Sequence, residues 1–289
     1  MNLGQVYTKR TIADYMVNLF SIANGARVLD PCFGGGVFVE SLLMNTSHEV
    51  LGVEIDKDSY DRFENPNPTR CQLLNCDFFD IEGEFDGIIM NPPYVRQEEI
   101  DAMAELGVTK QKLQSACGLM TISTKANLYM YFILRAILLL KDGGELIAIV
   151  PKYRRDIDNE FEYQLRTLGT LTDVWDVEDT LFDEPMIDVR IIKFVKGECC
   201  RQRTRHHRMS VGDNRITVKD VFESELLLTT KDCFTTVAEE LCDDLPNELP
   251  FVVKRLAEIV KDEKLSLDEL NTLCWEDSSA MFNKIYSRV

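Results

Sequence analysis

The stretch Asp86-Gly-Ile-Ile-Met-Asn-Pro-Pro-Tyr-Val95 decides which fold the rest of the sequence supports. Gly87–Met90 predicts a short buried strand, because an apolar run of this length ends in residues that cannot continue a sheet. The two prolines fix φ and remove both N–H groups, so the backbone leaves the strand in a stiff, extended turn. Ligands of open α/β sheets bind at the carboxyl ends of the strands. The sequence therefore predicts a binding site at this turn.

The turn Asn91–Tyr94 offers groups that suit a planar ring with an exocyclic NH2 group. Asn91 Oδ1 and the Pro92 carbonyl can each accept one amine hydrogen, and the Tyr94 ring can stack on the plane. Pro93 is the second of the two prolines that keep the turn rigid. A plainer interpretation is a proline-terminated strand in which asparagine is a turn residue and tyrosine packs at the surface. These four residues alone leave both interpretations open.

Upstream of the turn, a strand, a glycine turn and a helix follow one another. Arg27–Asp30 predicts the strand, Pro31–Gly36 the turn and Val37–Met44 an amphipathic helix. Glycines let a backbone approach a ligand closely, and a helix N-terminus favours a negative group, which together are typical of a nucleotide-binding unit. The spacing Asp30-Pro-x-x-Gly34-x-Gly36 is not the dinucleotide fingerprint, and a glycine turn alone is a weak signal.

Acidic residues follow the next two predicted strands. Glu49–Asp56 ends on carboxylates about twenty residues after the glycines, where an acid can accept both hydroxyls of a ribose. Glu54 is the first candidate for this role and Asp56 the second. The following strand, Cys71–Cys76, leads into Asp77-Phe78. Asp77 could bond an adenine amine and Phe78 could pack on the ring, or the pair could be a turn aspartate beside a core phenylalanine.

Downstream of the turn, residues 95–125 show only one weak helix, Glu98–Leu106, and so long a connection within a compact domain is usually functional or mobile. Outside this connection we also expect a helix at Lys9–Ala23, a helix at Asn127–Leu140, a loop at Lys141–Gly144, a strand at Glu145–Val150, a helix at Glu160–Leu168 and strands at Thr170–Trp175 and Ile187–Val195. The sequence thus predicts seven strands, of which the last two are antiparallel neighbours at the edge of the sheet because no helix separates them.

The character of the sequence changes after residue 197. Arg201–Arg208 is a concentrated basic run, which is interpreted either as a solvated linker or as a strip that contacts phosphates. From Asp220 to Val289 the pattern is helical and acidic. We therefore expect a catalytic domain over residues 1–197, followed over 198–289 by a basic linker and a small, mainly helical C-terminal region.

Composition sets limits on the partners. The chain has 289 residues and a formal net charge of -17, so it repels nucleic acid as a whole, and any contact requires a local basic patch or a partner subunit. Nine cysteines without CxxC pairs, and no apolar segment at the N-terminus, indicate a cytoplasmic protein with no export signal. The apolar run Tyr129–Leu140 contains Arg135 and is too short to span a membrane. We expect no metal, no disulfide and no membrane segment.

Taken together, these residues resemble the gamma class of S-adenosylmethionine-dependent DNA adenine-N6 methyltransferases. Ala126-Asn127-Leu128-Tyr129 and the segment from Gly143 to Pro151 are similar to its Eco57I-like branch, and the likeness covers residues 4–197. The motifs that carry it, in order, are Gly4-Gln-Val-Tyr-Thr8, Asp30-Pro-x-x-Gly-x-Gly36, Glu54, Asp77-Phe78 and Asn91-Pro-Pro-Tyr94. The resemblance implies an α/β fold, with a seven-stranded Rossmann-like methyltransferase sheet that has helices on both faces.

The resemblance also implies roles. The cofactor, S-adenosyl-L-methionine, would contact Tyr7, Thr8, Asp30, Pro31, Gly34, Gly36, Glu54, Ile55, Asp77, Phe78 and Asn91. Within this set, Tyr7 and Thr8 would meet the methionine moiety, Glu54 the ribose, and Asp77 and Phe78 the adenine. The turn Asn91–Tyr94 would receive a target adenine rotated out of the duplex. A second aromatic residue, Phe182, would pack against that base.

Two departures from the family pattern qualify this expectation. Lys9 stands where family members usually have proline, which leaves the first motif less rigid. The family's C-terminal region usually includes a large DNA-reading domain, whereas residues 198–289 are mainly acidic. Recognition is then either minimal or supplied by a partner subunit, and we expect weak DNA binding. The candidate nucleic-acid contacts are Arg96, Arg201, Arg203, Arg205 and Arg208.

Other functions remain open on the sequence alone. Enzymes that methylate RNA bases or a protein glutamine amide also combine such a turn with this core, and all of these substrates present a planar NH2 group. A methyltransferase fold retained as a non-catalytic subunit is a further alternative. The favoured hypothesis is a site-specific DNA methyltransferase of a restriction-modification, phage or orphan modification system.

Overall fold

The computed structural model describes residues 8–118, 126–152, 161, 165, 168–177, 188–197, 201–212 and 215–227. The chain divides into two compact units, one formed by Met1–Glu198 with Arg203–Ser224 and the other by Cys199–Gln202 with Glu225–Val289. Almost all of the described residues belong to the first unit.

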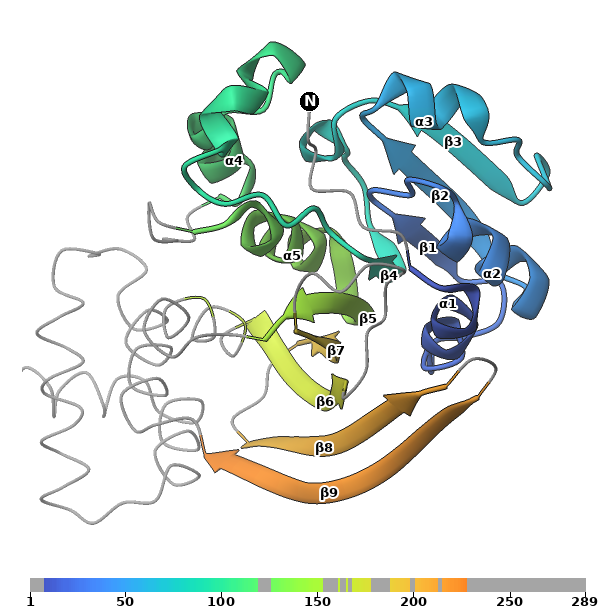
Figure 1. The fold of residues 1–289 in the computed structure, drawn as a ribbon, viewed down its shortest axis with the longest axis vertical. Coiled ribbons are helices and arrows are strands. Elements are labelled where there is room, and N and C mark those ends of the chain that lie inside the picture. Colours follow the sequence, from blue (N-terminus) through green and yellow to red (C-terminus); the bar gives the residue numbers. More distant parts are fainter. Residues whose placement is uncertain are drawn as a thin grey trace, which may run out of the picture. The chain divides into compact units, whose positions relative to one another are not determined.

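The helices and strands alternate along most of this unit (Figure 1). Their bounds are α1 (Arg10–Val17), β1 (Arg27–Asp30), α2 (Val37–Asn45), β2 (Glu49–Glu54), α3 (Lys57–Arg62), β3 (Cys71–Asn75), β4 (Phe85–Met90), α4 (Lys110–Ala116), α5 (Leu128–Leu139), β5 (Leu140–Pro151), β6 (Gly169–Val177), β7 (Val189–Lys196), β8 (Arg201–Val211) and β9 (Ile216–Leu227), with short 3-10 helices η1 (Phe78–Asp80) and η2 (Ile100–Leu106).

The described strands form one nine-stranded sheet in the order β3-β2-β1-β4-β5-β7-β6-β8-β9. Strands β1 to β5 are parallel, and β7 runs antiparallel to both of its neighbours, β5 and β6. β6 therefore points the same way as β5, and β8 is parallel to β6. The carboxyl ends of these seven strands consequently lie along one edge of the sheet.

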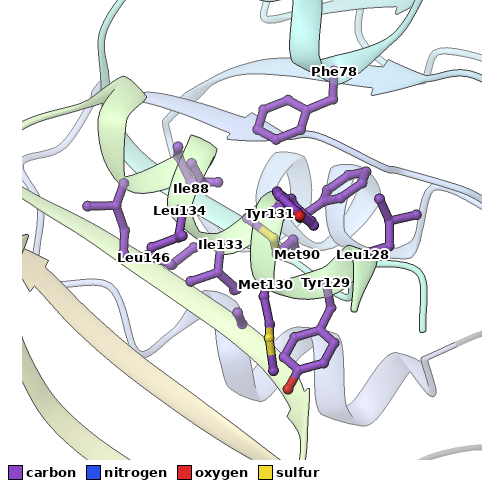
Figure 2. Packing of buried hydrophobic residues seen from close by; sticks show 14 of the residues in the cluster. Phe78, Ile88, Met90, Leu128, Tyr129, Met130, Tyr131, Ile133, Leu134 and Leu146 are labelled. Atoms are coloured by element: carbon purple, nitrogen blue, oxygen red, sulfur yellow. The ribbon is translucent and has the colours of Figure 1, made fainter. Parts of the chain in front are cut away.

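The sheet has a buried core on each face, because successive side chains of a strand point to opposite sides. Ile88 and Met90 of β4 belong to the cluster that contains α5, whereas Ile89 between them belongs to the cluster that contains α1 and α2. Figure 2 shows Ile88, Met90 and Leu146 of the sheet packed beside the apolar side chains of α5. Helices on both faces confirm the predicted α/β architecture.

Helix α5 is buried on almost every side, and its one charged residue has a structural role. The Arg135 guanidinium donates to the Ala116 carbonyl at 3.2 Å and to the Ile81 carbonyl at 2.5 Å. Hydrogen bonds from a charged donor to backbone carbonyls offset the cost of placing that charge at the edge of an apolar core. Arg135 thus fixes the end of α4 and the residue after η1 to α5.

The strands β1 to β4 and the helices α2 and α5 confirm the predictions within one or two residues, whereas α3 and η1 were not predicted. Helix α1 ends earlier than expected, at Val17. The weak helix at Glu98–Leu106 is the 3-10 helix η2, and α4 follows it without having been predicted. Of the expected helix Glu160–Leu168, only Phe161, Leu165 and Leu168 are described, each with helical backbone.

Four expectations about the later strands are wrong. Lys141–Gly144 is not a loop but an irregular part of β5, since Leu140 pairs with Phe85 and Glu145 already pairs with Gly87. β6 and β7 are antiparallel neighbours as predicted, but they do not form the sheet edge, because β8 and β9 extend the sheet to nine strands where seven were expected. The basic run is strand β8, not a linker, and Asp220–Leu227 is strand, not helix.

The failure to predict strand β8 from the sequence has a physical explanation. Its backbone pairs with β6 from Asp173 to Val177, and the His207 ring stacks on Trp175 with centroids 4.9 Å apart. Only Thr204 and Met209 of this strand are buried among its described side chains. The two buried positions are an odd number of residues apart, so the sequence shows no alternation of apolar and polar residues. The basic side chains therefore gave no strand pattern, although the backbone of this segment pairs with β6 in the sheet.

Candidate active site

The turn after β4 is held by hydrogen bonds of its own side chains. Asn91 Nδ2 donates to Thr8 Oγ1 at 3.2 Å, and the Tyr94 hydroxyl donates to Asn91 Oδ1 at 2.6 Å. The Leu128 amide donates to the Val95 carbonyl at 3.0 Å, which ties the end of the turn to the start of α5. These contacts fix the Asn91 amide with its nitrogen towards α1 and its oxygen towards the tyrosine.

The Tyr94 ring lies between the two cores. It packs edge-on against Tyr129 of α5, with centroids 6.4 Å apart, and its hydroxyl is 3.4 Å from the Ile149 carbonyl of β5. The residue is partly buried and contacts both hydrophobic clusters. Its orientation is therefore set by packing as well as by Asn91.

The glycine turn between β1 and α2 contains two residues with left-handed backbone, Gly34 at φ 52° and Gly36 at φ 82°. Such angles favour glycine. A Cβ atom on Gly36 would also lie 2.0 Å from the Phe63 ring, so this position requires glycine for packing within the protein. The Gly34 amide donates to Glu54 Oε2 at 2.8 Å, which joins the turn to the end of β2.

Glu54 and Asp56 have different surroundings. Glu54 is only 4% exposed and accepts from the Gly34 and Asp56 amides, both at 2.8 Å. Burial raises the pKa of Glu54 against the effect of these hydrogen bonds. Asp56 caps α3 by accepting from the Ser59 amide and hydroxyl. Between the two sequence candidates, Glu54 lines a cavity together with the glycine turn, and Asp56 is a helix cap.

Asp30 is fully buried at the end of β1. One oxygen, Oδ1, accepts from the Cys32 amide at 3.3 Å, and Oδ2 has no hydrogen-bond partner among the described residues. Burial raises the pKa of Asp30 to about 8, and the nearby Glu54 carboxylate contributes to the rise. The ionised form would be stabilised by a cationic group or hydrogen-bond donor placed beside Oδ2.

Asp77 is held through both of its oxygens. Oδ1 accepts from the Phe79 amide at 3.0 Å, and Oδ2 lies 2.7 Å from Lys112 Nζ of α4. Burial lowers the pKa of Lys112, but the hydrogen bonds to Asp77 and Asp80 outweigh it, so the net shift is upward. Beside it, Phe78 is 2% exposed and stacks on Phe132 of α5 with centroids 5.1 Å apart.

One cavity collects most of these groups. It is lined by Thr8, Pro31, Cys32, Phe33, Gly34, Gly35, Val37, Phe38, Glu54, Ile55, Asp77, Phe78, Phe79, Asn91, Pro93, Met103, Val108, Leu128 and Phe132. The lining includes nine of the residues that the sequence singled out, from the glycine turn, the ends of β2 to β4 and the start of α1. Asp30, Gly36, Pro92 and Tyr94 adjoin it without lining it. Tyr7 and Phe182 lie outside the described residues.

No sequence signal assigned a role to four apolar residues of the cavity lining, although Leu128 belongs to one of the motifs of the resemblance. Met103 and Val108 come from the long connection after the turn, and Leu128 and Phe132 come from α5. The unusual length of that connection was a signal that it had a function. Nothing in the pattern of α5 distinguishes a residue that lines a cavity from one that fills the core, since both are apolar.

Four of the five candidate nucleic-acid residues lie in the first unit, and Arg201 belongs to the second. Arg96, Arg203 and Arg208 are exposed, and of Arg201 only the backbone is described. Arg205 Nε lies 2.9 Å from Asp173 Oδ1, and His207 bridges Asp173 and Asp220 at 2.9 and 2.7 Å. Arg205 is thus engaged with the neighbouring strand β6 of the sheet.

Neither a metal cluster nor a membrane-spanning helix occurs in the part of the chain that the structure describes. Its residues contain no group of three or more histidine, cysteine or acidic side chains arranged to hold a metal ion. None of its helices is both long and apolar enough to cross a membrane.

The same part of the chain resembles known proteins. Residues 40–165 match the Eco57I restriction-modification methylase family. The match covers the end of the glycine unit, the acidic strand ends, the turn after β4 and α5, and it confirms the resemblance to Eco57I-like methylases. The type II methyltransferase M.HincII from Haemophilus influenzae is 32% identical over 155 residues, which cover 53% of this chain and 28% of that protein. The chain thus matches about a quarter to a third of the length of such relatives.

Solved structures agree on the fold. The methyltransferase subunit of a type I restriction-modification system from Streptococcus thermophilus has a TM-score of 0.58 at 18% identity, covering 73% of this chain and 50% of that one. A class I S-adenosylmethionine-dependent methyltransferase from Listeria monocytogenes has a TM-score of 0.53 at 15% identity, covering 68% and 63%. The Eco57I-like segment of this chain therefore lies within a class I methyltransferase fold.

Proposed function

We propose that this chain is an S-adenosyl-L-methionine-dependent DNA adenine-N6 methyltransferase of a restriction-modification or orphan modification system. The observation that carries the proposal is the shared cavity: the amine-accepting turn, through Asn91 and Pro93, lines the same cavity as Glu54 and Asp77. A methyl donor and an NH2 acceptor could then meet at the carboxyl edge of the sheet. We place the catalytic domain in the first unit, which includes β8 and most of β9.

The residues of the cavity fit the cofactor. Asp30 is buried with an oxygen that lacks a partner among the described residues, and the cationic amino-acid end of the cofactor would satisfy it. Glu54 would accept from the ribose hydroxyls, and Asp77 from the adenine amine, with Ile55 and Phe78 against the rings. Thr8, Pro31 and Gly34 would line the methionine end, while Gly36 shapes the turn. Tyr7 is proposed to contact the methionine moiety, as the resemblance implies.

The chain's own groups would position the target amine. Asn91 Oδ1 accepts from the Tyr94 hydroxyl in this structure. In the proposed complex, Asn91 Oδ1 and the Pro92 carbonyl are the two acceptors of the amine. Two acceptors draw the amine nitrogen towards tetrahedral geometry and free its lone pair for attack. The bound cofactor supplies an electrophilic methyl group. Tyr94 and Phe182 are proposed to stack on the flipped base, so most of the rate would come from positioning and fixed dipoles.

Contact with DNA is proposed along the carboxyl edge of the sheet. The end of β8 lies four strands from β4 in the sheet order, about 19 Å at the usual strand spacing. That distance matches roughly five to six base pairs of duplex. We propose that Arg208 and Arg96 contact phosphates there, while Arg205 supports the strand through Asp173. Arg201 and Arg203 stand at the start of β8, away from that edge. A separate recognition subunit is proposed to supply most of the sequence specificity.

Transfer of a labelled methyl group from S-adenosylmethionine tests the proposal. Unmethylated genomic DNA, total RNA and a protein extract are offered together, and the labelled nucleosides or amino acids are then identified. We expect N6-methyladenine in DNA. Asn91→Ala should reduce transfer by at least about 1,000-fold while cofactor affinity changes little, because it removes an interaction made with the reacting group. Label in RNA or in a protein glutamine, or substantial activity of Asn91→Ala, would contradict the proposal.

A further inference from the structure

A lysine that does not line the cavity contacts a carboxylate that does. Lys112 Nζ lies 2.7 Å from Asp77 Oδ2 and 2.7 Å from Asp80 Oδ1. The Asp77 side chain is 9% exposed and lines the cavity, whereas Lys112 and Asp80 do not line it. Lys112 thus contacts Asp77 without lining the cavity itself.

Lys112 is itself held in place. It lies in the first turn of α4, where its amide donates to Thr109 Oγ1 at 3.2 Å. The other end of α4 receives the hydrogen bond from Arg135 to the Ala116 carbonyl. The residues just before α4 contribute Met103 and Val108 to the cavity wall. Because α4 is anchored at both ends, the Lys112 ammonium group restricts the position of Asp77 Oδ2.

Both Asp77 oxygens keep the capacity to accept another hydrogen bond. Each oxygen of an ionised carboxylate has about two lone-pair sites, of which the Phe79 amide uses one on Oδ1 and Lys112 one on Oδ2. An ionised carboxylate only accepts, so it favours a ligand that presents an NH2 group. A ligand with a carbonyl oxygen at the same place could not hydrogen-bond to Asp77, because both groups are acceptors.

We propose that Lys112 is a positioning residue that makes Asp77 selective for the 6-amino group of the cofactor's adenine over a 6-oxo group. The proposal rests on the function proposed above. Lys112 orients Oδ2 through their 2.7 Å contact, and Asp77 then accepts from the amine. Specificity arises because a site with a fixed, buried acceptor rejects an analogue that cannot donate to it.

The test compares binding of two ligands to the full chain by calorimetry: S-adenosylhomocysteine and its deaminated analogue S-inosylhomocysteine. The wild type should prefer the adenine ligand by at least about tenfold, the ratio that one charge-assisted hydrogen bond supplies. Lys112→Met should remove most of that preference by weakening only the adenine ligand. Lys112→Arg should retain it, as should Lys110→Met, because Lys110 Nζ instead lies 3.4 Å from Gln97 Oε1 and 3.7 Å from Asp101 Oδ2.

Two further variants separate positioning from structural support. Asp77→Asn should lose the preference as Lys112→Met does, and combining the two changes should reduce the ratio no further, since one residue acts through the other. Asp80→Asn, which keeps the Lys112 contact with Asp77, should retain it. Equal loss of both ligands in Lys112→Met, or an unchanged ratio, would overturn the role of Lys112. A wild type that binds neither ligand would overturn the proposed function, and this inference with it.

Discussion

At the scale of single residues, Asp30 is a buried acid whose charge depends on its surroundings. A carboxylic acid that is fully buried beside Glu54 favours its neutral form, and the pKa of Asp30 rises to about 8. A residue held in this way costs the fold little while protonated. It offers a negative charge when a cation arrives.

The stability of the protein should therefore depend on pH through Asp30. Its pKa is raised in the folded state, so the native state binds this proton more tightly than the unfolded chain. The stabilisation is fully present below about pH 4 and is lost as the pH rises through about 8. Relative to Asp30→Asn, the wild type should lose on the order of a few kcal/mol between pH 5 and pH 8. Urea unfolding of both proteins at these two pH values measures the difference, and parallel pH profiles would contradict it.

At the scale of elements, β8 is a strand that its side chains did not predict. Its sequence is mainly basic and polar, yet Met209 is completely buried in the cluster that also contains Trp175 and Val177 of β6. His207 adds a ring stacked on Trp175 and hydrogen bonds to Asp173 and Asp220. Figure 1 shows β8 and β9 as a long two-stranded ribbon along the sheet.

Because β8 belongs to the folded unit, Met209→Ala should destabilise that unit. Removing a fully buried methionine costs roughly 2–5 kcal/mol through lost burial and the cavity left behind. The exposed Lys219→Ala in β9 is the matched control, with an expected change of about 0.5 kcal/mol or less. Chemical denaturation followed by circular dichroism measures both changes. If Met209→Ala were as stable as the wild type, the segment would behave as a linker.

At the scale of the whole molecule, net charge limits the affinity for DNA. The formal net charge of -17 opposes approach to a polyanion, and the exposed Arg96 and Arg208 offset it only locally. Relatives such as M.HincII are longer than the part that this chain matches. Under the proposed function, a supplementary recognition element would offset this negative charge.

The isolated chain should accordingly bind duplex DNA weakly, with a dissociation constant above about 1 μM at physiological salt, in the range of non-specific contacts. Fluorescence anisotropy with a labelled duplex, measured over a series of salt concentrations, tests this. Combining Arg96→Ala with Arg208→Ala should flatten the salt dependence by about two phosphate contacts. Nanomolar affinity for the chain alone would show that it carries a complete recognition surface.

The sequence by itself determined the local elements of the site. Asn91–Tyr94 had to end a strand because prolines cannot continue one, and Gly34 and Gly36 marked the turn because left-handed backbone favours glycine. Short apolar runs bounded by turn residues located β1 to β4, and longer helical patterns located α2 and α5. These signals are local, so one sequence contains them in full.

Only the tertiary structure decided how these elements combine. It brought Met103 and Val108 across the cavity, paired Lys112 with Asp77 over a separation of 35 residues, and joined the Tyr94 hydroxyl to Asn91. It also placed β8 beside β6, where main-chain hydrogen bonds require no particular side chains. Such contacts depend on which segments meet in space, and the sequence of one polar or basic segment does not show its partner.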